Sequence, residues 1–314
     1  MAVTRREFSA LSFAAALAAG PARAQSGTPL VIARGGPDEG APRATRGAYE
    51  LAIRAGADFI YADFVATKDG ALIARPDNEL SASTDVASLP EFAGRRTTKT
   101  IDGAQRSGWF CEDFTLAEIK TLVCVEAGAR HGRSDSKPAV LSFQDVTDIA
   151  RAGSVRAARV VGVYAGLVRP AYFTGLNLAL EPLIAAAIEK AGYNSAAAAM
   201  FVASLDAAAL KTLAGLTRAR RVQRMSGAAG DGDAAWLAGV HAYAQAVAPD
   251  AALLTSGFCR KAHAAGLVVH AWAAPEDSER VKVAAFAAGA DGVCAEFARA
   301  AVRARGAAMR RRAG

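Results

Sequence analysis

The sequence predicts an α/β fold, a (β/α)8 TIM barrel that carries one hairpin strand and an inserted segment. Short apolar runs alternate with helical patterns from residue 30 to residue 298. The number of strand–helix units matches a barrel of eight. The chain has 314 residues, of which 52% are hydrophobic and 21% are charged, which suffices for a sizeable core. This composition excludes disordered, collagen-like and disulfide-scaffold proteins.

The first predicted elements are two strands, one helix and a hairpin. The apolar run 30–33 predicts a strand, and the helix 44–55 that follows ends at a glycine. The run 59–64 predicts a second strand. A turn sequence, 67–70, leads to the apolar run 72–74, so the second strand and this run are predicted to form a hairpin.

The later elements repeat the strand–helix pattern. Helix 181–190 ends before Gly192, and Asp206 can cap a helix over 207–213. The remaining strands are predicted at 158–164, 199–204, 221–223, 244–247, 267–272 and 292–294.

Residues 86–137 interrupt this pattern and predict an insertion on the barrel. They contain one clear helix start, where Thr115 and Glu118 have the spacing of a capping box. The polar stretch 131–137 predicts a loop.

The positive charge lies at the two ends of the chain. The net charge is +7, of which residues 1–24 carry +2 and residues 299–314 carry +6, leaving −1 for the 25–298 body. A nucleic-acid-binding body is therefore excluded. The basic segment 299–314 predicts either a final amphipathic helix or a frayed tail, and its arginines either face solvent or contact anionic lipid.

Residues 1–24 have the order of features of a twin-arginine-type signal peptide. Thr4-Arg5-Arg6-Glu7-Phe8 resembles the export motif, residues 11–19 are apolar but too short to span a bilayer, and residues 22–24 fit a cleavage site. We therefore expect a periplasmic or otherwise exported protein, with an uncleaved amphipathic arm as the alternative.

The four cysteines have no zinc-type spacing. Cys111 and Cys124 bracket the predicted short helix, so they could pair in an oxidising compartment or remain free. Cys259 and Cys294 are expected to be buried free thiols.

Several stretches, in order along almost the whole chain after residue 25, resemble the glycerophosphodiester phosphodiesterase family of phospholipase C-like barrels. Thr67-Lys68-Asp69-Gly70 matches a family motif. The other stretches that carry the resemblance are V-I-A-R-G-G at 31–36, A-G-A-D-F-I-Y-A-D at 55–63, D-F-T-L-A-E-I at 113–119, G-L-V-V-H-A-W at 266–272 and G-A-D-G-V at 289–293. The insertion resembles that of the periplasmic members.

The resemblance implies hydrolysis of glycerophosphodiesters to glycerol 3-phosphate and an alcohol. The family reaction uses two histidines for proton transfer and a divalent metal, Ca²⁺ or Mg²⁺, held by carboxylates. In this sequence Arg34 and Pro76 occupy the two histidine positions. Arg43 and Tyr61 stand where the family has glutamates, and Asp63 alone remains as a weak, incomplete metal ligand.

The replaced residues cannot perform the family chemistry. One positioned proton-transfer group contributes roughly 10²–10⁴ in rate. Arginine stays protonated and proline has no side-chain donor or acceptor. Ca²⁺ needs about 6–8 oxygen ligands. We therefore hypothesise a barrel that kept its fold and lost the reaction, and that binds a small anionic phosphoester through guanidinium groups.

Strand ends predict which side chains reach the mouth of the barrel. Three alternatives to the hypothesis of anion binding at this mouth remain open. Arg34 and Arg43 could simply pair with Asp63 and Asp77. A divergent hydrolase could use His270 with Asp63 or Glu296. The chain could also be an envelope interaction protein acting through its insertion and basic tail. The predicted mouth residues are Arg34, Tyr61, Asp63, Arg75 or Asp77, Arg169, Ser204, His270, Trp272 and Glu296.

Overall fold

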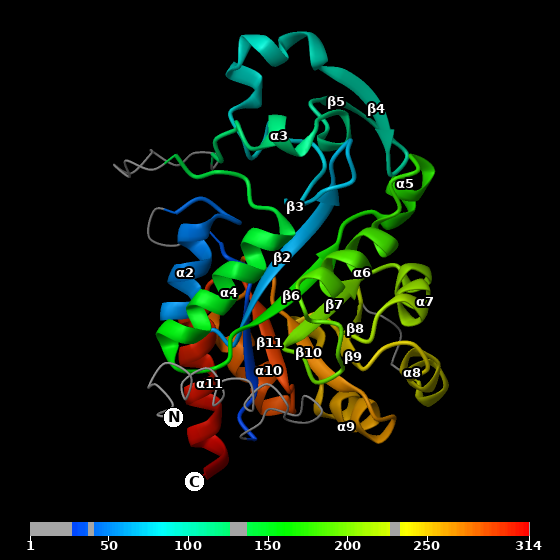
Figure 1. Ribbon diagram of the computed structural model, residues 1–314. Helices are drawn as coiled ribbons and strands as arrows, with labels where there is room; N and C mark the ends of the chain where they lie inside the picture. Colours follow the sequence, from blue (N-terminus) through cyan, green and yellow to red (C-terminus); the bar gives the residue numbers. More distant parts are fainter. Residues whose placement is uncertain (1–26, 37–40, 126–136, 227–232, 314) are drawn as a thin grey trace, which may run out of the picture.

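The fold is a closed (β/α)8 barrel, as the sequence predicts (Figure 1). The computed structural model describes residues 27–36, 41–125, 137–226 and 233–313. The sheet closes because β1 pairs in parallel with both β2 and β11. In ring order the eight strands are β1 (Leu30–Ala33), β2 (Phe59–Ala66), β6 (Gly162–Leu167), β7 (Met200–Ser204), β8 (Arg220–Arg224), β9 (Ala246–Ala248), β10 (Val268–Trp272) and β11 (Gly292–Ala295).

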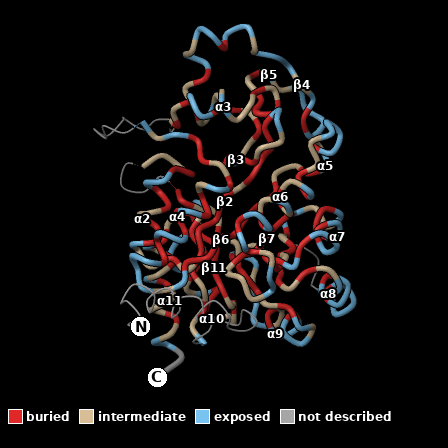
Figure 2. The backbone as a smooth tube through the Cα atoms, viewed as in Figure 1, coloured by how far each residue is buried: buried red, intermediate tan, exposed pale blue. Residues whose placement is uncertain are grey.

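Helices surround the ring, and buried residues concentrate on the strands they cover (Figure 2). The predicted helices over 44–55, 181–190 and 207–213 are present, and Asp206 Oδ1 accepts hydrogen bonds from the first-turn amides of the last of them. The helices outside the insertion are α2 (Arg46–Arg54), α4 (Phe143–Ala157), α5 (Pro170–Gly175), α6 (Leu180–Lys190), α7 (Ala207–Leu216), α8 (Ala234–His241), the 3-10 turn Ala251–Leu253, α9 (Ser256–Ala264), α10 (Glu279–Ala288) and α11 (Ala298–Ala313).

The predicted strand 158–164 starts too early, because the structure has the long helix α4 before it and β6 begins only at Gly162. Ser142 and Asp145 form a capping box at the start of α4. Ala158 ends the helix in a left-handed conformation with φ 50°. The Ser-x-x-Asp signal was present in the sequence, but β-branched residues and a glycine inside α4 weaken its helical pattern.

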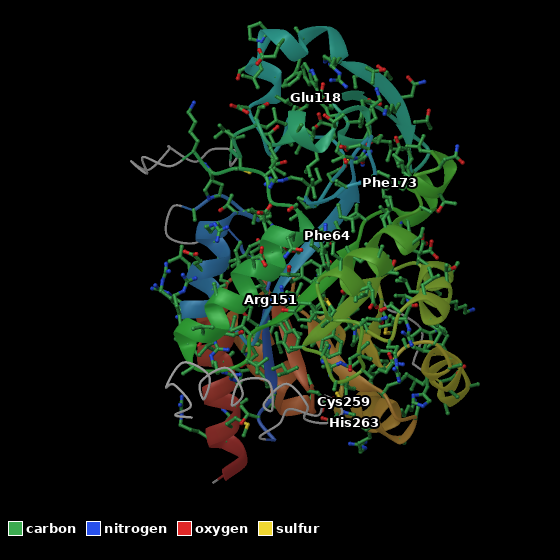
Figure 3. The ribbon with its side chains drawn as sticks, viewed as in Figure 1. Phe64, Glu118, Arg151, Phe173, Cys259 and His263 are labelled. Carbon is green, nitrogen blue, oxygen red and sulfur yellow. The ribbon has the colours of Figure 1, made fainter. Side chains whose placement is uncertain are left out.

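The insertion sits above the C-terminal ends of the strands, next to the hairpin strand β3 (Leu72–Ala74) (Figure 1). β3 is antiparallel to β2, as predicted. The Thr115–Glu118 capping box is present, and Figure 3 shows Glu118 in this upper part of the molecule. The insertion's own elements are the 3-10 turns Val86–Ser88, Pro90–Arg95 and Cys111–Asp113, the hairpin β4 (Thr97–Ile101) and β5 (Ala104–Gly108), and α3 (Leu116–Ile119).

The basic C-terminal segment is helical through residue 313, so of the two predicted alternatives the structure has the helix. Ala301, Ala304 and Ala308 are buried along one side of α11 and pack it against the barrel. The predicted signal peptide lies outside the described residues, as does most of the predicted loop 131–137. Within the described residues, no helix has the length and apolar character that a membrane span requires.

All four cysteines are free and buried, so Cys111 and Cys124 do not form the disulfide considered from the sequence. The Cys111 thiol donates to the Ala66 carbonyl oxygen at 3.2 Å. Cys124 Sγ instead accepts a hydrogen bond from Arg75 Nη2 at 2.7 Å.

Candidate functional site

The mouth of the barrel holds seven converging polar and aromatic side chains, called here the mouth cluster. Four of them follow or end a barrel strand, Tyr61 and Asp63 lie within β2, and Arg43 lies just before α2. Parallel strands place their carboxyl ends at one face of a barrel, which explains why residues so distant in sequence meet there. The mouth cluster consists of Arg34, Arg43, Tyr61, Asp63, Arg224, Trp272 and Glu296.

Glu296 is the anion of the mouth cluster. Its carboxylate is 2.7 Å from Arg43 Nη1 and 3.2 Å from Arg34 Nη2, and its side chain is only 2% exposed. The backbone beside it must stay small: a Cβ on Gly36 would lie 2.5 Å from Glu296 Oε1. The sequence alternative in which Arg34 and Arg43 pair with Asp63 and Asp77 is therefore wrong, because both arginines turn to Glu296.

Two guanidinium groups, those of Arg34 and Arg224, pack against the indole ring of Trp272. The Arg34 guanidinium lies 4.6 Å from the indole centroid and that of Arg224 lies 3.6 Å from it. Arg34 also donates to the Ala273 carbonyl oxygen at 2.9 Å. Cation–π contacts of this kind favour keeping both charges close together at the mouth.

Asp63 is half-buried beside Tyr61, whose hydroxyl donates to Asp63 Oδ1 at 2.5 Å. Burial raises the pKa of the Asp63 carboxyl above its usual value, although Tyr61 and the three mouth-cluster arginines act in the opposite direction. Burial also raises the pKa of the Tyr61 hydroxyl well above its usual range, so it remains a donor.

The mouth cluster contains several polar atoms that are buried and unsatisfied. Within the described chain, Arg34 Nε, Arg224 Nε and both Glu296 carboxylate oxygens have no hydrogen-bond partner. The Glu296 contacts are thus ion pairs without hydrogen-bond alignment. An unsatisfied buried polar atom costs about 1–3 kcal/mol. The arrangement therefore suits a site that receives a polar group from outside the chain.

Asp77 and Pro76 lie apart from the mouth cluster. The Asp77 carboxylate pairs with Arg169 Nη1 at 2.9 Å and with Arg106 Nη1 at 3.1 Å, which ties the start of α5 to the insertion hairpin. Pro76 is exposed. The sequence predicted Asp77 at the mouth, but its carboxylate pairs instead with Arg106 of the insertion and with Arg169 before α5.

Two other predicted mouth residues have structural partners. Arg75 is buried, and besides its bond to Cys124 it contacts the Ser83 carbonyl oxygen at 3.4 Å. Ser204 is buried and its Oγ accepts from the Asp206 amide at 3.0 Å.

Arg224 is the mouth-cluster residue that the sequence analysis missed, because the predicted strand ended at Gln223. Arg220, Val222 and Arg224 alternate along β8, which is the pattern of inward-facing residues. Arginines at two such positions were the signal that could have identified it.

His270 does not reach the mouth. It is fully buried inside the barrel, with Nδ1 3.3 Å from Tyr164 Oη and its ring 4.9 Å from that of Phe201. The expectation that His270 lies among the mouth residues is therefore wrong. Burial lowers the pKa of its imidazole to about 4. Figure 3 labels another histidine, His263 of α9, which lies at the opposite end of the molecule from Glu118 and pairs with Asp291 at 2.8 Å.

The buried neutral His270 predicts a pH-dependent stability. The pKa of the His270 imidazole falls from 6.5 in the unfolded chain to about 4 in the folded chain. The contribution of neutral His270 to the free energy of unfolding is therefore fully present above pH 6.5 and is lost as the pH falls towards 4. The expected loss is about 3 kcal/mol. Urea unfolding at pH 7 and pH 4.5 measures it, and His270→Gln should flatten the difference. The exposed His241→Gln is the control; an equal flattening there would contradict the assignment.

Comparison with known proteins identifies relatives of this chain. The model of the glycerophosphoryl diester phosphodiesterase family matches residues 34–300. The Arabidopsis thaliana glycerophosphodiester phosphodiesterase GDPD6 is 37% identical over 149 residues, which cover 47% of this chain and 39% of the relative. The GDPDL1 protein of the same plant is 33% identical over 99 residues, 31% of this chain and 13% of the relative. The matches thus span well under half the length of these curated relatives.

Solved structures share the barrel. An Oleispira antarctica phosphodiesterase in complex with the product sn-glycerol-3-phosphate has a TM-score of 0.63 at 18% identity, covering 89% of this chain and 97% of that one. A glycerophosphodiester phosphodiesterase from Agrobacterium tumefaciens has a TM-score of 0.62 at 17% identity, covering 87% and 99%. Likeness at this identity concerns the fold alone. Because the family model covers most of the sequence, the chain belongs to the glycerophosphoryl diester phosphodiesterase family.

Proposed function

We propose that this chain is an exported family member that has lost the hydrolytic reaction and binds an anionic phosphoester directly at the barrel mouth. The observation that carries this proposal is the convergence of three guanidinium groups, those of Arg34, Arg43 and Arg224, around one buried carboxylate and one indole. Guanidinium binds phosphate oxygens in a bidentate manner without a metal.

The two histidines of the family reaction have no counterpart in the mouth cluster. Arg34 stands at the first histidine position, while Pro76, at the second, is exposed and has no titratable group. His270 could not replace them, since its imidazole is enclosed by Tyr164 and Phe201. General acid–base catalysis requires a group within hydrogen-bond reach of the reacting proton. This supports the loss of turnover and weighs against a divergent hydrolase based on His270.

The donor set does not fit a divalent cation. Asp63 Oδ1 already accepts from Tyr61, and Glu296 faces two arginines. Among the residues that the structure describes, no three His, Cys, Asp or Glu side chains are grouped as metal ligands. Ca²⁺ prefers about 6–8 oxygens, and nearby guanidinium groups repel it.

The proposal predicts binding without turnover. The purified chain, assayed with Ca²⁺, with Mg²⁺ and with chelator, should release no glycerol 3-phosphate from glycerophosphocholine above a heat-denatured sample. The same protein should bind glycerol 3-phosphate in calorimetry, with an affinity that falls as salt is added. A family enzyme with both histidines serves as the positive control for turnover.

Two results would overturn different parts of this proposal. Metal-dependent turnover by the folded chain would show that a rebuilt catalytic site exists. An absence of binding to glycerol 3-phosphate, inorganic phosphate and sulfate would show that the mouth arginines serve only the internal ion pairs with Glu296.

A further inference from the structure

A second arginine-rich site lies at the opposite end of the barrel from the mouth. It is a pocket of about 490 Å³ between the C-terminal ends of α2 and α4, called here the underside pocket. Its volume falls within the range of ligand pockets, roughly 300–1,000 Å³. It is lined by Glu50, Ile53, Arg54, Gly56, Gly153, Arg156, Ala157 and Arg159.

The space exists because the lining backbone carries small side chains. Gly153 allows α4 to approach α2 closely, since a Cβ there would lie 2.6 Å from Ile53 Cδ1. Gly56 has a left-handed φ of +100°, and a Cβ there would meet only the α11 side chain Val302, at 3.5 Å. Gly56 and Ala157 leave a hollow that larger side chains would fill.

Three guanidinium groups face this hollow against a single lining carboxylate. Arg156 Nη2 is 3.2 Å from Glu50 Oε1, and the same oxygen is 3.9 Å from Arg46 Nη1. The Glu50 carboxylate therefore pairs with both Arg46 and Arg156. Arg54 is exposed in the last turn of α2 and has no ion pair with any described residue. The lining thus carries an excess of positive charge.

Arg159 has a buried donor with no acceptor. Its Nη2 donates to the carbonyl oxygens of Ile53 and Ala57, at 3.1 and 2.8 Å, and so covers the end of α2. Its Nη1 is buried without a hydrogen-bond partner in the described part of the chain, and reaches Asp58 Oδ1 only at 3.8 Å. Asp58 is already paired with Arg305, at 2.6 Å. An anion in the pocket would satisfy this donor.

We propose that the underside pocket binds a phosphate group through Arg54, Arg156 and Arg159. Bidentate guanidinium contacts suit phosphate oxygens. The group could belong to a free phosphate or to the headgroup of an anionic phospholipid. The site is independent of the mouth cluster and does not rest on the proposed function.

The test compares three variants of the full chain with the wild type. Arg54→Gln/Arg156→Gln alters the underside pocket at two exposed side chains. Arg34→Met/Arg224→Met alters the mouth. Arg218→Gln removes one exposed charge between α7 and β8 and is the control for charge alone. Calorimetry with inorganic phosphate measures the free anion. It is repeated for the underside change in the Arg34→Met/Arg224→Met background, because the mouth is proposed to bind phosphate too. Co-sedimentation with phosphatidylglycerol or phosphatidylcholine vesicles measures the lipid.

We expect the underside variant to lose about tenfold or more in affinity for phosphate, for phosphatidylglycerol vesicles, or for both. The mouth variant should retain this binding and Arg218→Gln should change it little. Loss towards vesicles alone assigns the headgroup as ligand, and loss towards inorganic phosphate alone assigns the free anion. The proposal is overturned if the underside variant binds like the wild type, or if the wild type binds neither probe.

Discussion

Glu296→Gln is expected to lower the free energy of unfolding by about 3–5 kcal/mol, the range for breaking a buried ion pair. The substitution keeps the shape of the side chain but removes the one carboxylate that faces both Arg34 and Arg43. Arg34 and Arg43 would then lose the carboxylate that they share. Urea unfolding at pH 7, followed by circular dichroism, measures the change.

Glu279→Gln is the matched control. Glu279 pairs with Arg303 at 2.9 Å, but both side chains are largely exposed. Exposed pairs contribute about 0–1 kcal/mol, so this variant should unfold close to the wild type. If the mouth receives anions, added phosphate should stabilise Glu296→Gln more than the wild type. Equal unfolding midpoints for Glu296→Gln and the wild type would show that water already solvates the mouth arginines.

Arg34→Met and Arg224→Met should each weaken the binding of glycerol 3-phosphate by roughly 10- to 100-fold. A hydrogen bond to a charged group contributes about 1.5–3 kcal/mol, and 1.4 kcal/mol corresponds to a factor of ten. Methionine retains the contact with Trp272 while removing the charge. Calorimetry with glycerol 3-phosphate provides the measurement, after a thermal melt has shown that each variant is folded.

The two arginines share one indole ring, so their effects on binding should be coupled. The double variant should lose less affinity than the two single losses combined, as expected for side chains acting on one ligand. Arg280→Met, an exposed change on α10, is the control for overall charge. An unchanged affinity in both single variants would place the ligand outside the mouth cluster.

Local sequence patterns predicted most of the barrel. The runs at 30–33 and 59–64 are recognisable because buried parallel strands are nearly continuous apolar segments. Turn and cap residues such as Asp206 are equally local signals, since they act on backbone amides two or three residues away. Helix α4 was missed because its stability comes from packing against α2 and β2 more than from its own composition.

The mouth residues were predictable only as far as the barrel rule places strand ends at one face. That rule brought Arg34, Tyr61 and Asp63 to the mouth, together with Trp272 and Glu296. The rule does not predict which of these side chains pair with one another. Asp77 follows a strand too, yet its carboxylate pairs with arginines of the insertion and of the segment before α5. Strand alternation alone also did not show how deep His270 lies.

The sequence by itself determined the fold and the near-neutral charge of the body, and it predicts that Arg34 and Pro76 occupy the two histidine positions of the family. Each of these depends on residue type or on neighbours a few positions apart. Only the tertiary structure decided that Glu296 holds Arg34 and Arg43, and that His270 is enclosed. Those contacts join strands that closure of the ring brings together, and ion pairing is settled by distances and burial that no spacing along the chain encodes.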